Sequence, residues 1–441
     1  MTLKNQDKTI FNAIEKEKKR QFEGLELIPS ENYVSEAVLE AMGSILTNKY
    51  SEGFVAHRYY GGNIHIDEIE NEAVQRAKAL FGVAHVNVQP YSGSPANFAV
   101  YHALLNPGDA VSGMNLFDGG HLTHGWKVSA TARYFESHPY HVLPEGIVDY
   151  DELEQIAKEH KPKLIWCGAT AYPRVIEWAK FAKIADSIGA YLVADISHIS
   201  GLVAAGVHES PVPYVHVITT TTHKTLRGPR GAMIMVTKKG LEKDPEISSK
   251  IDKAIFPGLQ GGPHNHTTAA IAVALQEAST PEFKEYAKQI VKNTKTLEAE
   301  FKKSGINMVS AGSDNHLLLL DLSSNGSLGS QLEYAMDVAH MTANKNTIPG
   351  EPSSPYYPSG LRLGTPALTT RGFQEKDMVK VADWITRVIR HIEKDVLPKE
   401  QSERAAFIKA FKAKAAQDPF LKAIGQEIKA YTKDFPIPGT K

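Results

Sequence analysis

The stretch HVITTTTHKTLRGPRG, residues 216–231, decides the fold. Its four consecutive threonines are β-branched, and β-branched residues favour a strand. The strand runs directly into His223 and Lys224, and the following Gly228-Pro-Arg-Gly predicts a turn. Lysine is almost never fully buried unless it is paired. Lys224 therefore either extends to solvent, pairs with an acid, or has a chemical role at the edge of a sheet.

Short apolar runs alternate with helical patterns on both sides of this stretch, from about residue 82 to residue 236. Continuous Val/Ile/Leu runs separated by amphipathic segments are typical of a mostly parallel sheet with helices on both faces. The sequence thus predicts an α/β domain. The expected strands are 85–90, 110–114, 163–169, 191–197, 215–222 and 231–237, and the expected helices are 94–105, 149–160 and 177–189.

The pattern changes after Gly258. Long helices are expected over 267–278 and 281–305, followed by strands near 316–322, 341–346 and 361–366 and a mainly helical tail over 373–434. We therefore predict two domains, an N-terminal arm with a large α/β domain (1–284) and a smaller α+β domain (285–441). The loop 347–360, TIPGEPSSPYYPSG, is long and rich in Pro, Ser and Gly, and loops of that kind are often functional.

Composition excludes several classes of protein. The 441 residues include 49 Lys and Arg against 50 Asp and Glu, so the formal net charge of −1 gives no reason to expect nucleic acid or an anionic membrane as a partner. The longest apolar runs are too short to span a bilayer. Cys167 is the only cysteine, so a disulfide within the chain is impossible, and we expect a cytoplasmic protein without a secretory signal.

Three expected strand ends carry polar groups, and ligands of open α/β sheets bind at the carboxyl ends of strands. Ser92-Gly93-Ser94 open a helix and offer backbone N–H groups to a phosphate, although a serine there is often only a cap. Asp195 ends the run YLVA, where a carboxylate needs a partner, and Lys224 ends the threonine strand. A phosphate cradle, an acid and a lysine together match pyridoxal phosphate. The nicotinamide fingerprint G-x-G-x-x-G and the P-loop are absent.

Motifs spread over residues 25–373 carry a family resemblance. In order along the chain they are ELIPSENY, LTNKYSEG, RYYGG, NVQPYSGSPANFAVY, GGHLTHG, TTTTHKTLRGPRG, FPGLQGGP, DNHL, NKNTIP and SGLRLGTPALTTRG. The chain resembles serine hydroxymethyltransferases. The resemblance implies the aspartate aminotransferase-like fold type I of pyridoxal-phosphate enzymes, and reversible conversion of serine and tetrahydrofolate to glycine and 5,10-methylenetetrahydrofolate.

The resemblance also implies roles for individual residues. Lys224 would form the covalent Schiff base with the cofactor, Asp195 would face its pyridine nitrogen, and His121 would stack on its ring. Glu52 and Tyr60 would act as catalytic groups near the hydroxymethyl carbon. The remaining cofactor contacts would be Ser92, Gly93, Ser94, Thr170, His198 and His223, with Tyr50, Gly261 and Gly262 supplied by a second subunit.

The substrate carboxylate would bind Arg362, whose fork suits a carboxylate, with help from Ser35. Tetrahydrofolate as co-substrate would contact residues that include the long proline-rich loop: Glu52, Tyr59, Leu116, Gly120, His121, Leu122, Asn346, Ser354, Pro355 and Tyr356. The family works as a homodimer with shared active sites, and the sequence leaves open whether the chain forms a dimer or a tetramer.

Several stretches depart from the family pattern. GFVAHRYYGG (53–62) stands for GYPGKRYYGG, QGGPHNH (260–266) for QGGPLMH, and Phe117-Asp118 replaces a small residue and a histidine. These changes keep open a folate-independent threonine or allo-threonine aldolase, or an α-methylserine hydroxymethyltransferase. A catalytically silent binding protein is disfavoured because Lys224, Asp195 and Arg362 are all present. The pairs His121/His124 and His264/His266 lack an accompanying zinc motif, so we predict no metal.

Overall fold

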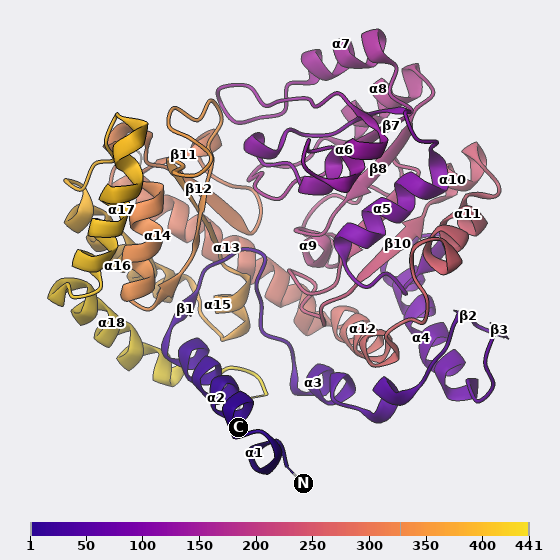
Figure 1. Cartoon of the computed structure of the whole chain (residues 1–441), viewed down its shortest axis with the longest axis horizontal. Coiled ribbons are helices and arrows are strands. Elements are labelled where there is room, and N and C mark those ends of the chain that lie inside the picture. Colours follow the sequence, from indigo (N-terminus) through magenta and orange to yellow (C-terminus); the bar gives the residue numbers. More distant parts are fainter. Residues whose placement is uncertain (1, 327, 440–441) are drawn as a thin grey trace. The chain divides into compact units, whose positions relative to one another are not determined.

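The computed structural model describes residues 2–326 and 328–439, which form two compact units (Figure 1). Unit 1 combines the residues up to Tyr33 with those from Gln289 onward, and unit 2 runs from Val34 to Lys288. None of the described helices has both the length and the apolar character that crossing a membrane requires.

A seven-stranded sheet lies at the centre of unit 2, in the order β4-β10-β9-β8-β7-β5-β6 among the described residues. The strands from β9 to β6 run parallel, whereas β10 is antiparallel to both of its neighbours. The predicted α/β class with a mostly parallel sheet is thereby confirmed. The strands are β4 (His85–Asn87), β5 (Ala110–Ser112), β6 (Glu136–Ser137), β7 (Leu164–Cys167), β8 (Tyr191–Asp195), β9 (Val217–Thr221) and β10 (Ala232–Val236).

Helices follow these strands where the sequence predicts them. The acid-rich start of α7 is capped by Asp149, whose side chain accepts a hydrogen bond from the Glu152 backbone N–H at 2.9 Å. α5 and α11 pack on the sheet through one buried apolar cluster that also contains Trp166 and Val193. The helices of unit 2 are α3 (Glu36–Met42), α4 (Ile64–Phe81), α5 (Gly93–Leu104), α6 (Ala130–Tyr134), α7 (Tyr150–His160), α8 (Trp178–Ser187), α9 (Ser200–Ala204), α10 (Lys238–Lys243), α11 (Ile247–Lys253) and α12 (Asn265–Ala278), together with the two-residue strands β2 (Gly53–Phe54) and β3 (His57–Arg58).

The turn after β9 uses its glycines for close packing. The left-handed position is Arg227, with φ of 60°. A Cβ atom on Gly228 would lie 2.8 Å from the Thr222 carbonyl oxygen and 2.9 Å from the Cβ of Ala274 on α12. Any side chain at Gly228 would therefore push the turn away from α12.

Unit 1 is an α+β unit with its own core. Its antiparallel sheet has the order β11-β12-β15-β14, and helices including α14, α16 and α18 share one apolar cluster with it. The strands are β11 (Asn307–Met308), β12 (Leu317–Asp321), β14 (Asn344–Asn346) and β15 (Gly360–Gly364), and the helices are α1 (Leu3–Gln6), α2 (Lys8–Glu23), α14 (Gly329–Val338), α15 (Pro366–Thr370), α16 (Glu375–Ile392), α17 (Gln401–Ala415) and α18 (Pro419–Tyr431). Helix α13 (Pro281–Lys303) contributes residues to both units.

The N-terminal residues belong to unit 1, whereas the sequence places them with the large domain. β1 (Leu25–Glu26) pairs in parallel with β13 (Met341–Thr342), and the buried Leu25 and Leu27 join the core of unit 1. The unit boundary after Lys288 lies close to the predicted domain boundary after residue 284. The division into domains stays a prediction.

Candidate active site

Asp195, at the carboxyl end of β8, is the centre of a buried polar network in unit 2. Its Oδ2 atom accepts hydrogen bonds from Asn97 Nδ2 at 2.9 Å and from His124 Nε2 at 3.2 Å. Its Oδ1 atom accepts one from the Ser197 backbone N–H at 3.0 Å. Burial alone would raise the pKa of Asp195, but these hydrogen bonds and the nearby histidines outweigh it and hold the pKa well below its usual range. The carboxylate is therefore an anion that is ready to face a cation.

Two of these partners, Asn97 and His124, were not predicted as site residues. Asn97 lies in the first turns of α5 and His124 ends the short helix Leu122–His124, so both reach Asp195 from other elements. His124 also stacks on Trp166, with ring centroids 5.0 Å apart and planes 8° apart. The sequence signals were a lone Asn among buried apolar residues and the second His of HLTH, which suggested only a metal pair.

His121, one of the predicted site residues, lies close to this network. Its Nδ1 atom is 2.7 Å from Thr123 Oγ1, which also accepts a hydrogen bond from Asn97 Nδ2 at 2.8 Å. Burial lowers the pKa of His121 to about 4, helped by the charges of His124 and Lys224. A neutral imidazole at neutral pH suits stacking against an aromatic ring.

Lys224 and His223 follow β9, at the same edge of the sheet as Asp195. The Lys224 side chain is buried, and its charge acts on both His121 and His223. Burial, Arg230 and Lys224 lower the pKa of His223 to about 3. The His223 Nδ1 atom is buried and has no hydrogen-bond partner among the described residues, as expected for a group that binds a polar ligand.

The predicted phosphate cradle lies at the amino end of α5. Ser92 is the N-cap residue, and its side chain makes no capping hydrogen bond, so the hydroxyl is not used to close the helix. The α5 backbone N–H groups start at Gly93 and Ser94 and form the positive end of a 12-residue helix. An ionised acid, a buried lysine, a neutral histidine and this helix end fit pyridoxal phosphate.

A sequence model of serine hydroxymethyltransferases matches residues 3–385. The chain belongs to the serine hydroxymethyltransferase family. It is 52% identical over 434 residues, 98% of this chain and 96% of the relative, to the serine hydroxymethyltransferase of Acidothermus cellulolyticus. It is 50% identical over 437 residues (99% and 96%) to that of Desulfotalea psychrophila, and 54% identical over 388 residues (88% and 92%) to that of Francisella tularensis subsp. mediasiatica. The predicted family and its class, pyridoxal-phosphate-dependent transferases of fold type I, are confirmed.

A second group of predicted serine hydroxymethyltransferase residues lies on segment 50–60 and the glycine loop 261–262. A Cβ atom on Gly261 would lie 3.0 Å from Glu52 Oε1, and one on Gly262 would lie 3.4 Å from the Tyr50 ring. The rings of Tyr50 and Tyr60 meet edge to face, with centroids 5.3 Å apart. Glu52, both tyrosines and both glycines are therefore brought together within unit 2.

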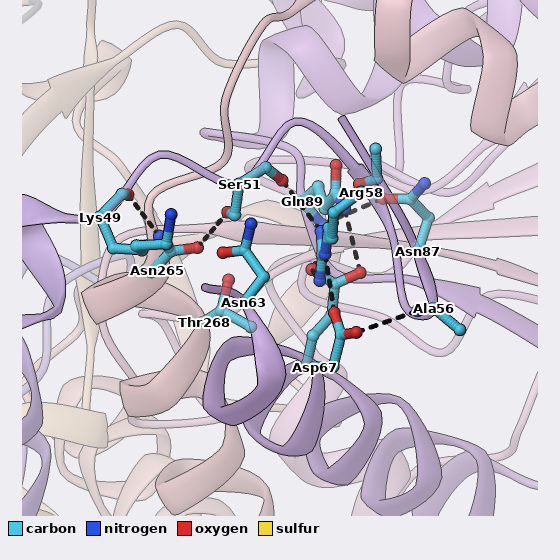
Figure 2. A network of polar contacts seen from close by, with 12 residues as sticks. Lys49, Ser51, Ala56, Arg58, Asn63, Asp67, Asn87, Gln89, Asn265 and Thr268 are labelled. Atoms are coloured by element: carbon cyan, nitrogen blue, oxygen red, sulfur yellow. Dashed lines mark hydrogen bonds and ion pairs between the residues drawn. The ribbon is translucent and has the colours of Figure 1, made fainter. Parts of the chain in front are cut away.

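A buried network positions this segment, and the sequence reasoning missed it (Figure 2). Arg58 is its hub: Nε donates to Asp67 Oδ1 at 2.8 Å and Nη2 to Glu70 Oε2 at 2.9 Å. Its Nη1 atom donates to the carbonyl oxygens of Ser51 at 3.0 Å and Gly53 at 2.8 Å. Charged residues in a sequence usually indicate a solvated face, and nothing local marks these as buried.

The predicted folate and substrate residues of unit 2 have identifiable local settings. A Cβ atom on Gly120 would lie 1.9 Å from the Met114 carbonyl oxygen, so this position accepts only glycine. Ser35 caps α3, where its Oγ accepts a hydrogen bond from the Val38 backbone N–H at 3.2 Å. Tyr59 and Leu122 are exposed, Leu116 begins a short helix, the Thr170 backbone N–H donates to the Gly119 carbonyl oxygen at 2.7 Å, and His198 is buried.

The predicted residues of unit 1 lie on β14, on β15 and in the loop between these two strands. Arg362 is 7% exposed, its Nε donates to Asn344 Oδ1 at 3.0 Å, and burial lowers its pKa to about 10. Asn346 lies on β14, where its Nδ2 donates to the Thr347 carbonyl oxygen at 2.7 Å. In the loop, Ser354 pairs with Tyr357 in a β-bridge, Pro355 lies between them, and Tyr356 is 80% exposed.

The ligand-type atoms of His121, His124 and Asp195 lie within 4.8 Å of one another, as in a metal site. However, His124 already hydrogen-bonds to Asp195, and His121 to Thr123. The prediction of no metal stays a prediction.

Proposed function

We propose that the chain catalyses the reversible conversion of serine and tetrahydrofolate to glycine and 5,10-methylenetetrahydrofolate, with pyridoxal phosphate as cofactor. The observation that carries this proposal is the buried Asp195 carboxylate, held ionised by Asn97 and His124 at the sheet edge where Lys224 ends its strand. Family membership over nearly the whole chain supports the same activity.

When bound, pyridoxal phosphate supplies a protonated ring that accepts electrons from the α-carbon of the amino acid. Asp195 would hold the proton on the ring nitrogen, because its anionic form is already favoured without the cofactor. Ser92, Gly93 and Ser94 would bind the phosphate at the positive end of α5. Lys224 would supply the amine for covalent attachment, and the neutral His121 would contact the ring.

Glu52 exchanges the proton near the hydroxymethyl carbon, and Tyr50 and Tyr60 orient the reacting groups beside it. Arg362 binds the carboxylate of serine or glycine. Its guanidinium stays charged at neutral pH even with a pKa of about 10, so it remains a suitable partner for an anion. The loop around Ser354–Tyr356 contributes to tetrahydrofolate binding.

We further propose a homodimer with shared active sites. Ile45, Tyr59 and Ile64 are 82%, 75% and 69% exposed, which is unusual for large apolar side chains so close in sequence. A second copy that covers this segment would bury these side chains, and Tyr50 and Glu52 would then contribute to the active site of that copy. Sedimentation of the wild type should give a dimer or a tetramer, and Ile45→Glu should shift it toward a monomer; a monomeric wild type would contradict the proposal. The cytoplasm stays the expected compartment.

The test is a turnover assay of serine, threonine and α-methylserine, each with and without tetrahydrofolate. We expect serine turnover that requires tetrahydrofolate, together with a cofactor that borohydride fixes to Lys224 and not to the Lys224→Ala variant. Threonine cleavage without any serine turnover would indicate the aldolase, and turnover restricted to α-methylserine would indicate the other alternative. Either result would overturn the proposed function.

A further inference from the structure

The segment that carries Tyr50, Glu52 and Tyr60 has little regular structure of its own. Its only strands are β2 and β3, two residues each, which pair only with one another. An isolated two-stranded hairpin is at best marginally stable. The position of Glu52 therefore depends on side-chain hydrogen bonds to this segment as well as on its backbone pairing.

Asn265, the first residue of α12, contacts the near end of this segment. Its Oδ1 atom accepts a hydrogen bond from Ser51 Oγ at 2.6 Å, and its Nδ2 atom donates to the Lys49 carbonyl oxygen at 2.6 Å (Figure 2). The two bonds hold Lys49 and Ser51, the residues on either side of Tyr50, and Ser51 directly precedes Glu52. Asn265 is 3% exposed and Ser51 is 0% exposed, so water cannot replace either bond.

Asn265 also lies three residues after the glycine loop, so it connects two parts of the site. Gly261 packs against the Glu52 carboxylate, and Gly262 packs against the Tyr50 ring. The Tyr91 hydroxyl donates to the Gly262 carbonyl oxygen at 2.7 Å and fixes the other side of this loop. Asn265 therefore fixes the distance between the glycine loop and the segment that carries Tyr50 and Glu52.

Two other side chains also hold the segment. Arg58 donates to the carbonyl oxygens of Ser51 and Gly53, the residues on either side of Glu52, and Asn63 Nδ2 donates to the Tyr60 carbonyl oxygen at 2.9 Å. Asn265 belongs to the stretch QGGPHNH. A side-chain amide both donates and accepts hydrogen bonds, and the double contact of Asn265 uses both functions.

We propose that Asn265 is a positioning residue for Glu52 and Tyr50, an inference that rests on the proposed function. It acts through its hydrogen bonds to Ser51 and Lys49. A displacement of about 1 Å in a catalytic group lowers turnover by up to about 100-fold.

The test compares Asn265→Leu with Ser51→Ala, the double variant and a matched control, Asn293→Leu. Asn293 is likewise a buried asparagine whose Nδ2 makes two hydrogen bonds, to Thr369 Oγ1 and the Phe373 carbonyl oxygen, both at 2.9 Å. Asn293→Leu controls for the loss of stability that any such substitution brings.

We expect Asn265→Leu to lower kcat for serine with tetrahydrofolate about 10-fold, with the KM for serine unchanged. Ser51→Ala should lower kcat about 3-fold, and the double variant should be no worse than Asn265→Leu, because both remove the same contact. Without cofactor, the backbone amides of residues 49–60 should exchange hydrogen about 10-fold faster in Asn265→Leu. Asn293→Leu should change the thermal midpoint but neither kcat nor this exchange.

Two failures can be told apart. A wild-type chain without folate-dependent serine turnover would overturn the proposed function and this inference with it. An active wild type whose kcat and exchange rates survive both Asn265→Leu and Ser51→Ala would overturn the inference alone. Ser51→Ala keeps the test decisive if Asn265→Leu does not fold.

Discussion

Replacing Arg58 by methionine should expose how much unit 2 depends on its buried charges. The Arg58 side chain is 4% exposed and that of Glu70 is 5% exposed, and their closest atoms are 2.9 Å apart. Arg58→Met keeps most of the volume but leaves the Glu70 carboxylate without its cation. Glu70 then retains the hydrogen bonds that Gln89 Nε2 donates to its two oxygens, at 3.0 and 3.1 Å.

The expected cost is about 3–5 kcal/mol at pH 8, the usual result of removing one partner of a buried ion pair. Coulomb's law agrees, since unit charges about 4 Å apart interact by about 4 kcal/mol at an effective dielectric constant of about 20. The cost should depend on pH. Burial raises the pKa of Glu70 and Arg58 opposes that rise, so losing Arg58 raises the pKa further.

The direction of this pH dependence follows from proton binding. Above the ordinary pKa of a glutamate, the unfolded chain releases the proton while the folded variant retains it, so the free energy of unfolding falls as pH rises. The loss relative to wild type should therefore be smaller at pH 5 than at pH 8. Urea denaturation at both pH values measures it, and Arg58→Met/Glu70→Gln is the control that removes the charge and should recover most of the loss. An equal loss at both pH values, without recovery in the double variant, would refute the reasoning.

Three further predictions concern individual groups. Asp195→Asn should weaken pyridoxal phosphate binding by about 10- to 100-fold, since a charge-assisted hydrogen bond is lost, and a cofactor titration that matches wild type would contradict this. His121→Asn should flatten the pH dependence of apoprotein stability between about pH 4 and pH 6.5, because in that range the unfolded histidine binds a proton and the folded one does not. Urea denaturation at several pH values should show that the free energy of unfolding rises less steeply with pH than in wild type, by up to about 1.4 kcal/mol per pH unit. Cys167 is fully buried, and burial raises the pKa of its thiol well above the usual value, so a thiol reagent should label it only after denaturation.

Six strands of the unit 2 sheet and the helices α5, α7, α8 and α12 could be predicted because each has a local signal. The run YLVAD became β8 and the threonine run became β9, and their carboxyl ends met at one edge as parallel strands must. The pairing of β1 with β13 had no such signal, since it joins Leu25 to Met341 across more than 300 residues. No period in either two-residue strand could indicate that partner.

The same distinction between local and tertiary signals applies to the residues of the candidate site. Lys224 and Asp195 could be predicted because their chemistry conflicts with the apolar strands before them. Asn97 and His124 could not, because their meeting with Asp195 depends on how α5 and the 122–124 helix pack. Arg58 likewise appears polar and exposed in the sequence, and only tertiary structure reveals that it is buried against Glu70.

Two of the buried acids of unit 2, Asp195 and Glu70, show what separates a ligand site from a structural ion pair. Glu70 has a full cation beside it, yet burial still raises its pKa. The pKa of Asp195 is lowered by donors aimed at its oxygens, and its partners on the protein side are an amide, an imidazole and a backbone N–H. These three donors leave the carboxylate ionised, which suits a cationic ring nitrogen. Preorganised dipoles of this kind need no rearrangement when the cation arrives, which is the condition for strong electrostatic binding in a buried site.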